Sequence, residues 1–201
     1  MTDLLVASRN RKKLAELRRV LDAAGVADLA LLSLEDVAPF QEAPETAATF
    51  EDNALAKARD AFAATGLATV ADDSGLKVSA LNGMPGVLSA RWSGVHGDDG
   101  ANTALLLAQL RDVPDERREA AFVSACALVS GTGEVVVRGV WPGHIAREPR
   151  GDGGFGYDPV FVPEASGRTA AELSAAEKDA ASHRGRALAK LLPALRELAT
   201  S

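Results

Sequence analysis

The stretch AFVSACALVSGTGEVVVRGVW, residues 121–141, decides the fold class of this chain. It holds two apolar runs rich in Val, residues 121–130 and 134–141, which are separated by Gly131-Thr132-Gly133. Apolar, β-branched runs on either side of a short glycine-containing connection are typical of a β-hairpin. We therefore expect two antiparallel strands in the middle of the chain.

Strand and helix patterns alternate along the residues before this hairpin. Short apolar runs predict strands at residues 4–7, 29–32 and 68–71. Helices are predicted at residues 12–24, 50–64 and 99–110, the last of them after a long loop rich in Gly and Pro. The chain is therefore expected to open as strand, turn and helix.

The residues after the hairpin carry clear helix-start signals. Short strands are predicted at residues 143–146 and 159–162. Capping-box patterns follow, Thr169 with Glu172 and Ser174 with Glu177. A long helix is predicted over residues 183–198, and because Pro193 removes an internal hydrogen bond we expect a kink or a break there.

Strands and helices intermixed in this way indicate an α/β (α+β) fold with a mixed β-sheet flanked by helices. The 201 residues, of which 47% are hydrophobic, are enough for a substantial core, so residues 1–201 are expected to form a single domain. Cys126 is the single cysteine and lies in an apolar run, which excludes an intrachain disulfide and predicts a buried thiol.

The charge and hydropathy of the chain exclude several classes of partner. A formal net charge of −6 argues against binding to a nucleic acid polymer or an anionic membrane. No run approaches the roughly 20 consecutive apolar residues of a membrane span, so we expect a soluble cytoplasmic protein. An anionic ligand must therefore meet one of the local basic clusters, around Lys13 or around Arg184.

The sequence Asp72-Asp73-Ser74-Gly75 follows an apolar run and suggests a turn that carries carboxylates. Such oxygen ligands suit Mg²⁺, but the same residues could equally form an Asx turn that only stabilises a loop. Glu45 stands upstream, and Asn53 and Lys57 lie four residues apart on one helical face. A carboxylate, an amide and an ammonium together favour a metal and phosphate site.

Near the N-terminus, Ser8, Asn10 and Lys13 fall in the turn between the first strand and the first helix. Free N–H groups at a helix start favour phosphate, although the sequence does not match the P-loop pattern. A helix cap with solvated basic side chains is the alternative interpretation of the same residues.

The residues 151–156, GDGGFG, match the G-x-G-x-x-G pattern of dinucleotide-binding proteins. The match is misleading, because that pattern needs a helix directly after it, and here a strand pattern bounded by prolines follows. We interpret the glycines instead as letting the backbone approach a flat ligand on which Phe155 could stack. Lys178, His183 and Arg184 could then donate to acceptors on a purine edge.

Taken together, these segments resemble the inosine/xanthosine triphosphate pyrophosphatase family, over residues 6–195. The resemblance rests on motifs in the same order along the chain: Ser8-Arg9-Asn10-Arg11-Lys12-Lys13, Glu45-Thr46 with Thr49-Phe50, Asn53-Ala54 with Lys57-Ala58, Ala71-Asp72-Asp73-Ser74-Gly75-Leu76, Pro85-Gly86-Val87 with Ser89-Ala90-Arg91, Gly153-Gly154-Phe155-Gly156-Tyr157-Asp158-Pro159 and Ser182-His183-Arg184-Gly185. Each motif is modest alone, but their shared order makes coincidence a poor explanation.

The resemblance implies a Mg²⁺-dependent enzyme that hydrolyses non-standard purine nucleoside triphosphates (ITP, dITP and XTP) to the monophosphate and pyrophosphate. It implies that Glu45 and Asp73 hold Mg²⁺ and that Asp73 is the general base. The residues expected to bind the substrate are Ser8, Arg9, Asn10, Arg11, Lys12, Lys13, Asn53, Lys57, Ser74, Phe155, Gly156, Tyr157, Asp158, Lys178, His183 and Arg184. The family also implies a homodimer, an elongated mixed sheet and two lobes with a central nucleotide cleft.

Two other functions remain open from the sequence. One is a related pyrophosphatase that acts on modified pyrimidine or methylated nucleotides. The other is a non-catalytic nucleotide-binding module built around residues 151–156. The first would prefer modified pyrimidine triphosphates as substrates, and the second would bind nucleotides without releasing pyrophosphate.

Overall fold

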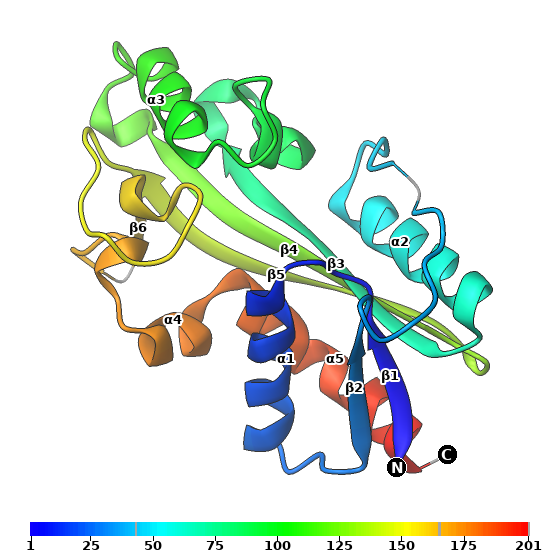
Figure 1. Ribbon diagram of the computed structural model, residues 1–201. Helices are drawn as coiled ribbons and strands as arrows, with labels where there is room; N and C mark the ends of the chain where they lie inside the picture. The colour runs from blue at the N-terminus through cyan, green and yellow to red at the C-terminus, as the bar shows by residue number, and fades with distance from the viewer. Residues whose placement is uncertain (43, 165, 201) are drawn as a thin grey trace. The chain divides into compact units, whose positions relative to one another are not determined.

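The computed structural model describes residues 1–42, 44–164 and 166–200, without the side chains of Arg11, Lys12 and Asp179. Within the described residues, six strands form one sheet in the order β2-β1-β3-β4-β5-β6 (Figure 1). The strands are β1 (Thr2–Val6), β2 (Leu29–Ser33), β3 (Ala68–Val78), β4 (Glu119–Ser130), β5 (Gly133–Ile145) and β6 (Phe161–Pro163).

The sheet is mixed, as the sequence predicts. β1 pairs in parallel with both β2 and β3, whereas β5 and β6 are antiparallel. β4 and β5 form the predicted hairpin around the short connection at Gly131 and Thr132. The α/β fold class expected from the sequence is therefore confirmed.

The helices also follow the predicted segments closely. They are α1 (Arg11–Ala23), α2 (Phe50–Thr65), α3 (Asp99–Gln109), α4 (Ala175–Ala181) and α5 (His183–Thr200). Short 3₁₀ turns lie at Ser79–Leu81, Gly86–Arg91, Asp115–Arg117, Asp158–Val160 and Ala170–Glu172. Both predicted capping boxes are present, at Thr169 and at Ser174. No helix in the described part of the chain is both long and apolar enough to cross a membrane.

The described chain divides into two compact units. The first consists of Met1–Asp73, Ser124–Gly139 and the residues from Arg184 onward, and the second of Ser74–Val123 and Val140–His183. The boundary falls inside β3, β4 and β5, so each of these three long strands contributes residues to both units.

The core of the first unit joins β1 to the faces of two helices. Leu4 and Val6 of β1 belong to one apolar cluster with Leu17 of α1 and Leu191 of α5. The cluster also contains Cys126, which is fully buried as predicted. Leu5 points to the opposite face of β1 and is fully buried as well, so both faces of this strand are covered.

The core of the second unit is built on aromatic rings. Phe122 of β4 packs edge-on against Phe161 of β6, with ring centroids 4.6 Å apart. Trp141 of β5 lies 5.4 Å from Phe161, and the ring of His183 stacks on Phe122 at 4.9 Å. These contacts fix His183, a predicted substrate-binding residue, against the core of its own unit.

The expected turn at Asp72-Asp73-Ser74-Gly75 is wrong, because β3 runs unbroken from Ala68 to Val78. The carboxylates of Asp72 and Asp73 meet charged and amide groups from other segments, so the backbone needs no Asx turn to satisfy them. Gly75 is required for a different reason: a Cβ there would lie 2.5 Å from the carbonyl oxygen of Gly86.

The expected break at Pro193 is also absent, since α5 continues through this residue to Thr200. Proline in a helix costs about 3 kcal/mol because it removes a hydrogen bond. Leu188 and Leu191 before the proline and Leu195 after it are all buried in the same core. Packing on both sides of Pro193 therefore stabilises a helix that continues through this residue.

Candidate functional site

Two adjacent carboxylates on β3 are the centre of the polar cluster in the first unit. Asp72 and Asp73 are 8% and 7% exposed, so both are nearly inaccessible to solvent. Successive residues of a strand point to opposite faces. Each carboxylate therefore meets a different set of partners, and the two have different electrostatic environments.

Asp72 is neutralised by two predicted substrate-binding residues. Its Oδ1 lies 2.8 Å from Nζ of Lys13, and its Oδ2 lies 3.3 Å from Nε of Arg184. Burial alone would raise the pKa of Asp72, but Lys13, Arg184 and Lys57 outweigh it and hold that pKa well below its usual range. Asp72 is therefore an ionised anchor that fixes Lys13 and Arg184, rather than a group that exchanges protons.

Glu16 of α1 is a second anion beside Arg184 and was not identified from the sequence. Its Oε2 lies 3.0 Å from Nη1 of Arg184, and the whole Glu16 residue is 9% exposed. Burial would lower the pKa of Arg184, but the charges of Asp72 and Glu16 raise it above its ordinary value. The sequence signal for Glu16 is its spacing of three residues from Lys13, which makes the two side chains neighbours on the helix.

Asp73 has a weaker set of stabilising partners than Asp72. Its Oδ2 accepts a hydrogen bond of 2.9 Å from Nδ2 of Asn53, and Oδ1 of Asn53 accepts one of 3.0 Å from the backbone N–H of Ala47. Burial raises the pKa of Asp73 above its ordinary value, although Lys57 and Asn53 act in the opposite direction. Asp73 is consequently a stronger base than an exposed aspartate.

Lys57 joins β3 to the loop between β2 and α2 that carries Glu42 and Glu45, called the acidic loop below. Its Nζ lies 2.7 Å from Oε1 of Glu45 and also donates to the backbone carbonyl oxygen of Asp72 at 2.7 Å. Burial would lower the pKa of Lys57, but the charges of Asp72, Asp73 and Glu45 raise it. The ammonium is therefore held positive beside the two carboxylates that the sequence assigns to metal binding.

The donor set formed by Glu45 and Asp73 is compatible with Mg²⁺. Among the described residues, no group of three or more His, Cys, Asp or Glu side chains is placed to hold a metal ion. Mg²⁺ does not require such a group, because it commonly binds through one or two carboxylates and completes its shell with water and substrate phosphates. The Glu45 side chain is 31% exposed, which leaves it accessible to such an ion.

The N-terminal turn brings further predicted residues to the first unit. Oγ of Ser8 accepts a hydrogen bond of 3.2 Å from the N–H of Asn10, directly before α1 begins at Arg11. Nε of Arg9 donates to Oε1 of Glu42 at 3.0 Å and so ties this turn to the acidic loop. The side chains of Arg11 and Lys12 lie outside what the structure describes.

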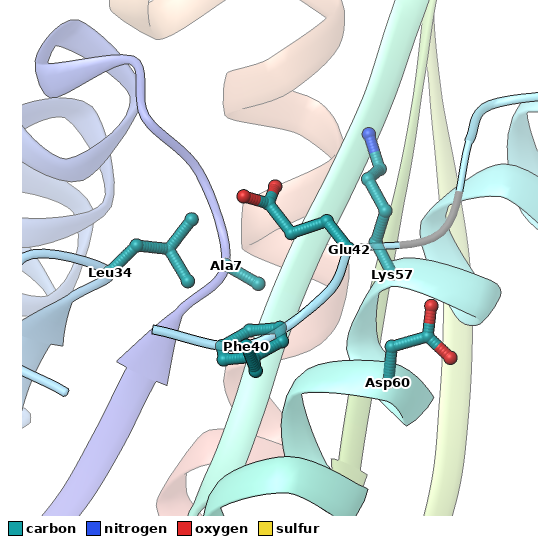
Figure 2. A pocket seen from close by; sticks show the side chains of 6 residues that line it. All are labelled: Ala7, Leu34, Phe40, Glu42, Lys57 and Asp60. Atoms are coloured by element: carbon teal, nitrogen blue, oxygen red, sulfur yellow. The ribbon is translucent and has the colours of Figure 1, made fainter. Parts of the chain in front are cut away.

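A small pocket lies beneath the acidic loop. It is lined by Ala7, Leu34, Phe40, Glu42, Lys57 and Asp60, as Figure 2 shows. Its volume of about 10 Å³ is room for roughly one water molecule, so it cannot itself hold a nucleotide. The pocket instead marks where the loop with Glu42 meets the helix that carries Lys57.

In the second unit, Asp158 organises the glycine-rich loop. Its Oδ2 accepts a hydrogen bond of 2.8 Å from the N–H of Phe155 and also contacts Nζ of Lys178. Gly154 has a φ of +77°, and a Cβ at this position would lie 2.1 Å from Oδ2 of Asp158. Glycine is therefore needed here both for the backbone conformation and for the close approach of the carboxylate.

This loop presents Phe155 and buries Tyr157. Phe155 is 42% exposed, and Nζ of Lys178 lies 5.2 Å from its ring centroid, within the range of a cation–π contact. Tyr157 is 4% exposed and its hydroxyl donates to the carbonyl oxygen of Ser89 at 2.8 Å. The N–H of Gly156 donates to Oδ2 of Asp99 at 2.7 Å. Phe155 is thus the member of this loop best placed to stack on a ligand.

The structure distributes the predicted site residues between two clusters. The cluster of the first unit contains Ser8, Arg9, Asn10, Lys13, Glu45, Asn53, Lys57, Asp73 and Arg184. The second unit contains Ser74, Phe155, Gly156, Tyr157, Asp158, Lys178 and His183. Their roles toward a substrate stay predictions, but the chemistry differs: the first group combines cations with buried carboxylates, and the second offers an aromatic ring and an ammonium.

Comparison with known proteins identifies the family of this chain. Residues 4–194 match the model of the Ham1 family. The chain is 84% identical over 200 residues to a dITP/XTP pyrophosphatase of Mycolicibacterium paratuberculosis, covering 99% of this chain and 98% of that protein. It is 76% identical to the dITP/XTP pyrophosphatase of Mycobacterium leprae, with 99% and 97% covered.

Solved structures give the same result. The crystal structure of a nucleoside-triphosphatase, or dITP/XTP pyrophosphatase, from Mycobacterium abscessus has a TM-score of 0.82 and 70% identity, covering 97% of this chain and 100% of that one. A HAM1 protein from Coxiella burnetii has a TM-score of 0.89 and 41% identity, with 98% and 100% covered. The family resemblance inferred from the sequence motifs is confirmed, and the chain belongs to the Ham1 family.

Proposed function

We propose that this chain hydrolyses ITP, dITP and XTP to the corresponding monophosphate and pyrophosphate, and that the reaction depends on Mg²⁺. The names of the relatives at 76% and 84% identity support the substrate class. The structural observation that carries the proposal is the position of Lys57, whose ammonium contacts Glu45 and the backbone of Asp72 directly before Asp73. Acidic and cationic groups suited to phosphate chemistry thus converge in one unit.

Asp73 is the proposed general base. Its buried carboxylate would accept a proton from a water that attacks the α-phosphorus. The bond between that phosphorus and the pyrophosphate oxygen then breaks, and pyrophosphate leaves. Nδ2 of Asn53 donates a hydrogen bond to Oδ2 of Asp73, and this bond orients the carboxylate before the substrate binds.

Lys13 and Lys57 are proposed to stabilise the negative charge of the phosphates. Their side chains are 18% and 16% exposed, so their charges act in partly desolvated surroundings where they are less screened. When bound by Glu45 and Asp73, Mg²⁺ would supply further electrostatic stabilisation of the phosphate oxygens. Ser8, Arg9 and Asn10, with Arg11 and Lys12, complete the proposed phosphate-binding segment.

Base recognition is assigned to the cluster of the second unit, which includes Ser74. Phe155 provides an exposed ring face for stacking, and Lys178 and His183 provide donors for the 6-oxo group that hypoxanthine and xanthine share. Adenine carries a 6-amino group, which would leave such donors unpaired. Arg184 is already bonded to Asp72 and Glu16, so part of its role is to hold the first cluster together.

The test is incubation of the purified protein with a panel of triphosphates, with and without Mg²⁺, followed by ³¹P NMR of the products. The proposal predicts monophosphate and pyrophosphate from ITP, dITP and XTP, slow turnover of ATP, and loss of turnover with a chelator. Release of orthophosphate, or a preference for modified pyrimidine triphosphates, would contradict it.

A homodimer in the cytoplasm is part of the same proposal. The family resemblance supports the homodimer, and the hydropathy of the sequence supports the cytoplasmic location. Sedimentation velocity at micromolar concentration tests the assembly, and a species of one chain's mass throughout the range would exclude the dimer.

A further inference from the structure

Arg118 is a buried cation in the second unit whose hydrogen-bonding partners are all neutral. It is 2% exposed, and its guanidinium donates to the backbone carbonyl oxygens of Leu110 at 2.6 Å, Ile145 at 2.8 Å and Ala146 at 2.8 Å. Among the described residues, no carboxylate lies within ion-pair distance of it. The carbonyl oxygens satisfy part of its donor capacity, but they do not neutralise its charge.

Further arginines add to this positive charge. Two open pockets, of about 360 and 420 Å³, are both lined by Arg118 and Arg147. Arg150 and His144 line the first and Arg111 the second. Burial is the largest cause of the lowered pKa of Arg118; the nearby charge of Arg147 lowers it further, and that of Asp115 acts in the opposite direction.

The acidic side chains near these pockets offset that charge only in part: Glu148 lines the first pocket, and Glu172 interacts electrostatically with Arg150. Asp115 pairs with Nε of Arg147 at 2.7 Å, but its side chain is 77% exposed, so the pair is well solvated. Nη1 of Arg147 donates to the carbonyl oxygen of Arg111 at 3.1 Å. Arg150 makes no side-chain hydrogen bond or ion pair with the part of the chain that the structure describes, and its guanidinium remains available at the pocket.

We propose that the first of these pockets, called the arginine pocket and lined by Arg118, Arg147 and Arg150, binds a small phosphate-bearing anion. Guanidinium groups recognise phosphate by paired hydrogen bonds, and Arg118 at the pocket wall is fixed in place by three backbone carbonyls before any ligand arrives. The pocket's volume of about 360 Å³ lies within the range of small-molecule sites and admits an anion as large as a nucleoside monophosphate. The site is built from residues of the second unit alone and does not depend on the proposed catalytic carboxylates.

The test is a titration of ¹⁵N-labelled full-length protein, without Mg²⁺, with inorganic phosphate, pyrophosphate and inosine monophosphate in separate arms. The backbone amides of residues 147–150 and the Nε–Hε group of Arg118 report on this pocket specifically. We expect saturable shifts of these signals at millimolar ligand or below, and the arm with the tightest binding identifies the size of the anion.

The Arg147→Ala/Arg150→Ala double variant is the decisive comparison, because both side chains can be removed without disturbing the buried contacts of Arg118. It is expected to weaken binding at this pocket at least tenfold, since each charged hydrogen bond typically contributes about that factor. Arg168→Ala is the matched control: its side chain is 53% exposed and it pairs with Glu177 outside the pocket. Absence of saturable shifts in all arms, or equal affinity in the double variant, would overturn the proposal.

Discussion

The ammonium of Lys57 lies 2.7 Å from the carboxylate of Glu45, although the two residues come from a helix and from the irregular loop that precedes it. The same nitrogen donates to the backbone carbonyl oxygen of Asp72, which precedes the proposed base. Lys57 thereby fixes the loop against β3. Through these two contacts, Glu45, Lys57 and Asp72 lie together although they are far apart in sequence.

Substitution of Lys57 by Met should lower turnover of ITP roughly 100-fold, because it removes a partly buried cation from the phosphate-binding cluster. The apolar stem is retained, so the fold should persist. The measurement is steady-state kinetics together with a urea denaturation curve. Arg59→Met on the same helix is the control, since Arg59 pairs with Glu134 through side chains 56% and 39% exposed. Equal activity of the two variants would show that Lys57 has no special role.

Glu16→Ala should destabilise the protein by about 1–3 kcal/mol, because it removes one of the two anions beside the buried Arg184 guanidinium. Glu51→Ala is the comparison, since the Glu51 side chain pairs with Arg138 where both are partly exposed and should cost about 0–1 kcal/mol. Urea denaturation followed by circular dichroism measures both. If the two variants lose the same free energy of unfolding, the ion pairs around the buried Arg184 do not stabilise the protein more than an exposed pair does.

Gly154→Ala should destabilise the second unit more than Gly156→Ala does. Both glycines have a positive φ, so either alanine carries a backbone cost of about 1–2 kcal/mol. Only at Gly154 would the added Cβ collide with Asp158, whereas at Gly156 nothing lies within 4 Å. Thermal denaturation of both variants gives the comparison. Identical melting temperatures would mean that the contact between Asp158 and this loop is not important for stability.

Arg168→Ala should raise the pKa of Glu177 from about 2 toward its ordinary value of 4.5, because the hydrogen bond from Arg168 is the largest cause of the lowered pKa. The folded-state pKa lies below the unfolded one, so the stabilisation from ionised Glu177 is complete above about pH 4.5 and is lost as the pH falls toward 2. A carboxyl ¹³C NMR titration of the wild-type protein and of Arg168→Ala measures the pKa of Glu177 in each. An unchanged midpoint in the variant would assign the shift to Ser174 instead.

The features that could be predicted from the sequence are those set by local patterns. The hairpin follows from its Val-rich runs and glycine connection, and the capping boxes at Thr169 and Ser174 follow from spacing alone. The grouping of Glu45 with Lys57 depends on the loop returning to α2, and it was suggested by residue type rather than by any local rule.

The features that could not be predicted depend on tertiary contacts. Asp72 to Gly75 resembles a turn, but partners such as Lys13 and Arg184, from elements far apart in sequence, satisfy the carboxylate and keep the strand extended. Glu16 is one charge among many on α1 until Arg184 is placed beside it. Pro193 is tolerated because core leucines lie on both sides of it. In each case the stabilising contacts come from residues far away in the sequence, so the pattern of neighbouring residues does not reveal them.

The most direct test of the proposed function is the rate at which the Asp73→Asn variant releases pyrophosphate from ITP in the presence of Mg²⁺. The amide fits the same space and avoids burying a charge, so the variant should fold with wild-type stability or better. It cannot accept the proton of the attacking water, and turnover should fall by about 10²-fold or more. A folded variant that releases pyrophosphate at the wild-type rate would contradict the assignment of Asp73 and, with it, the catalytic site described above.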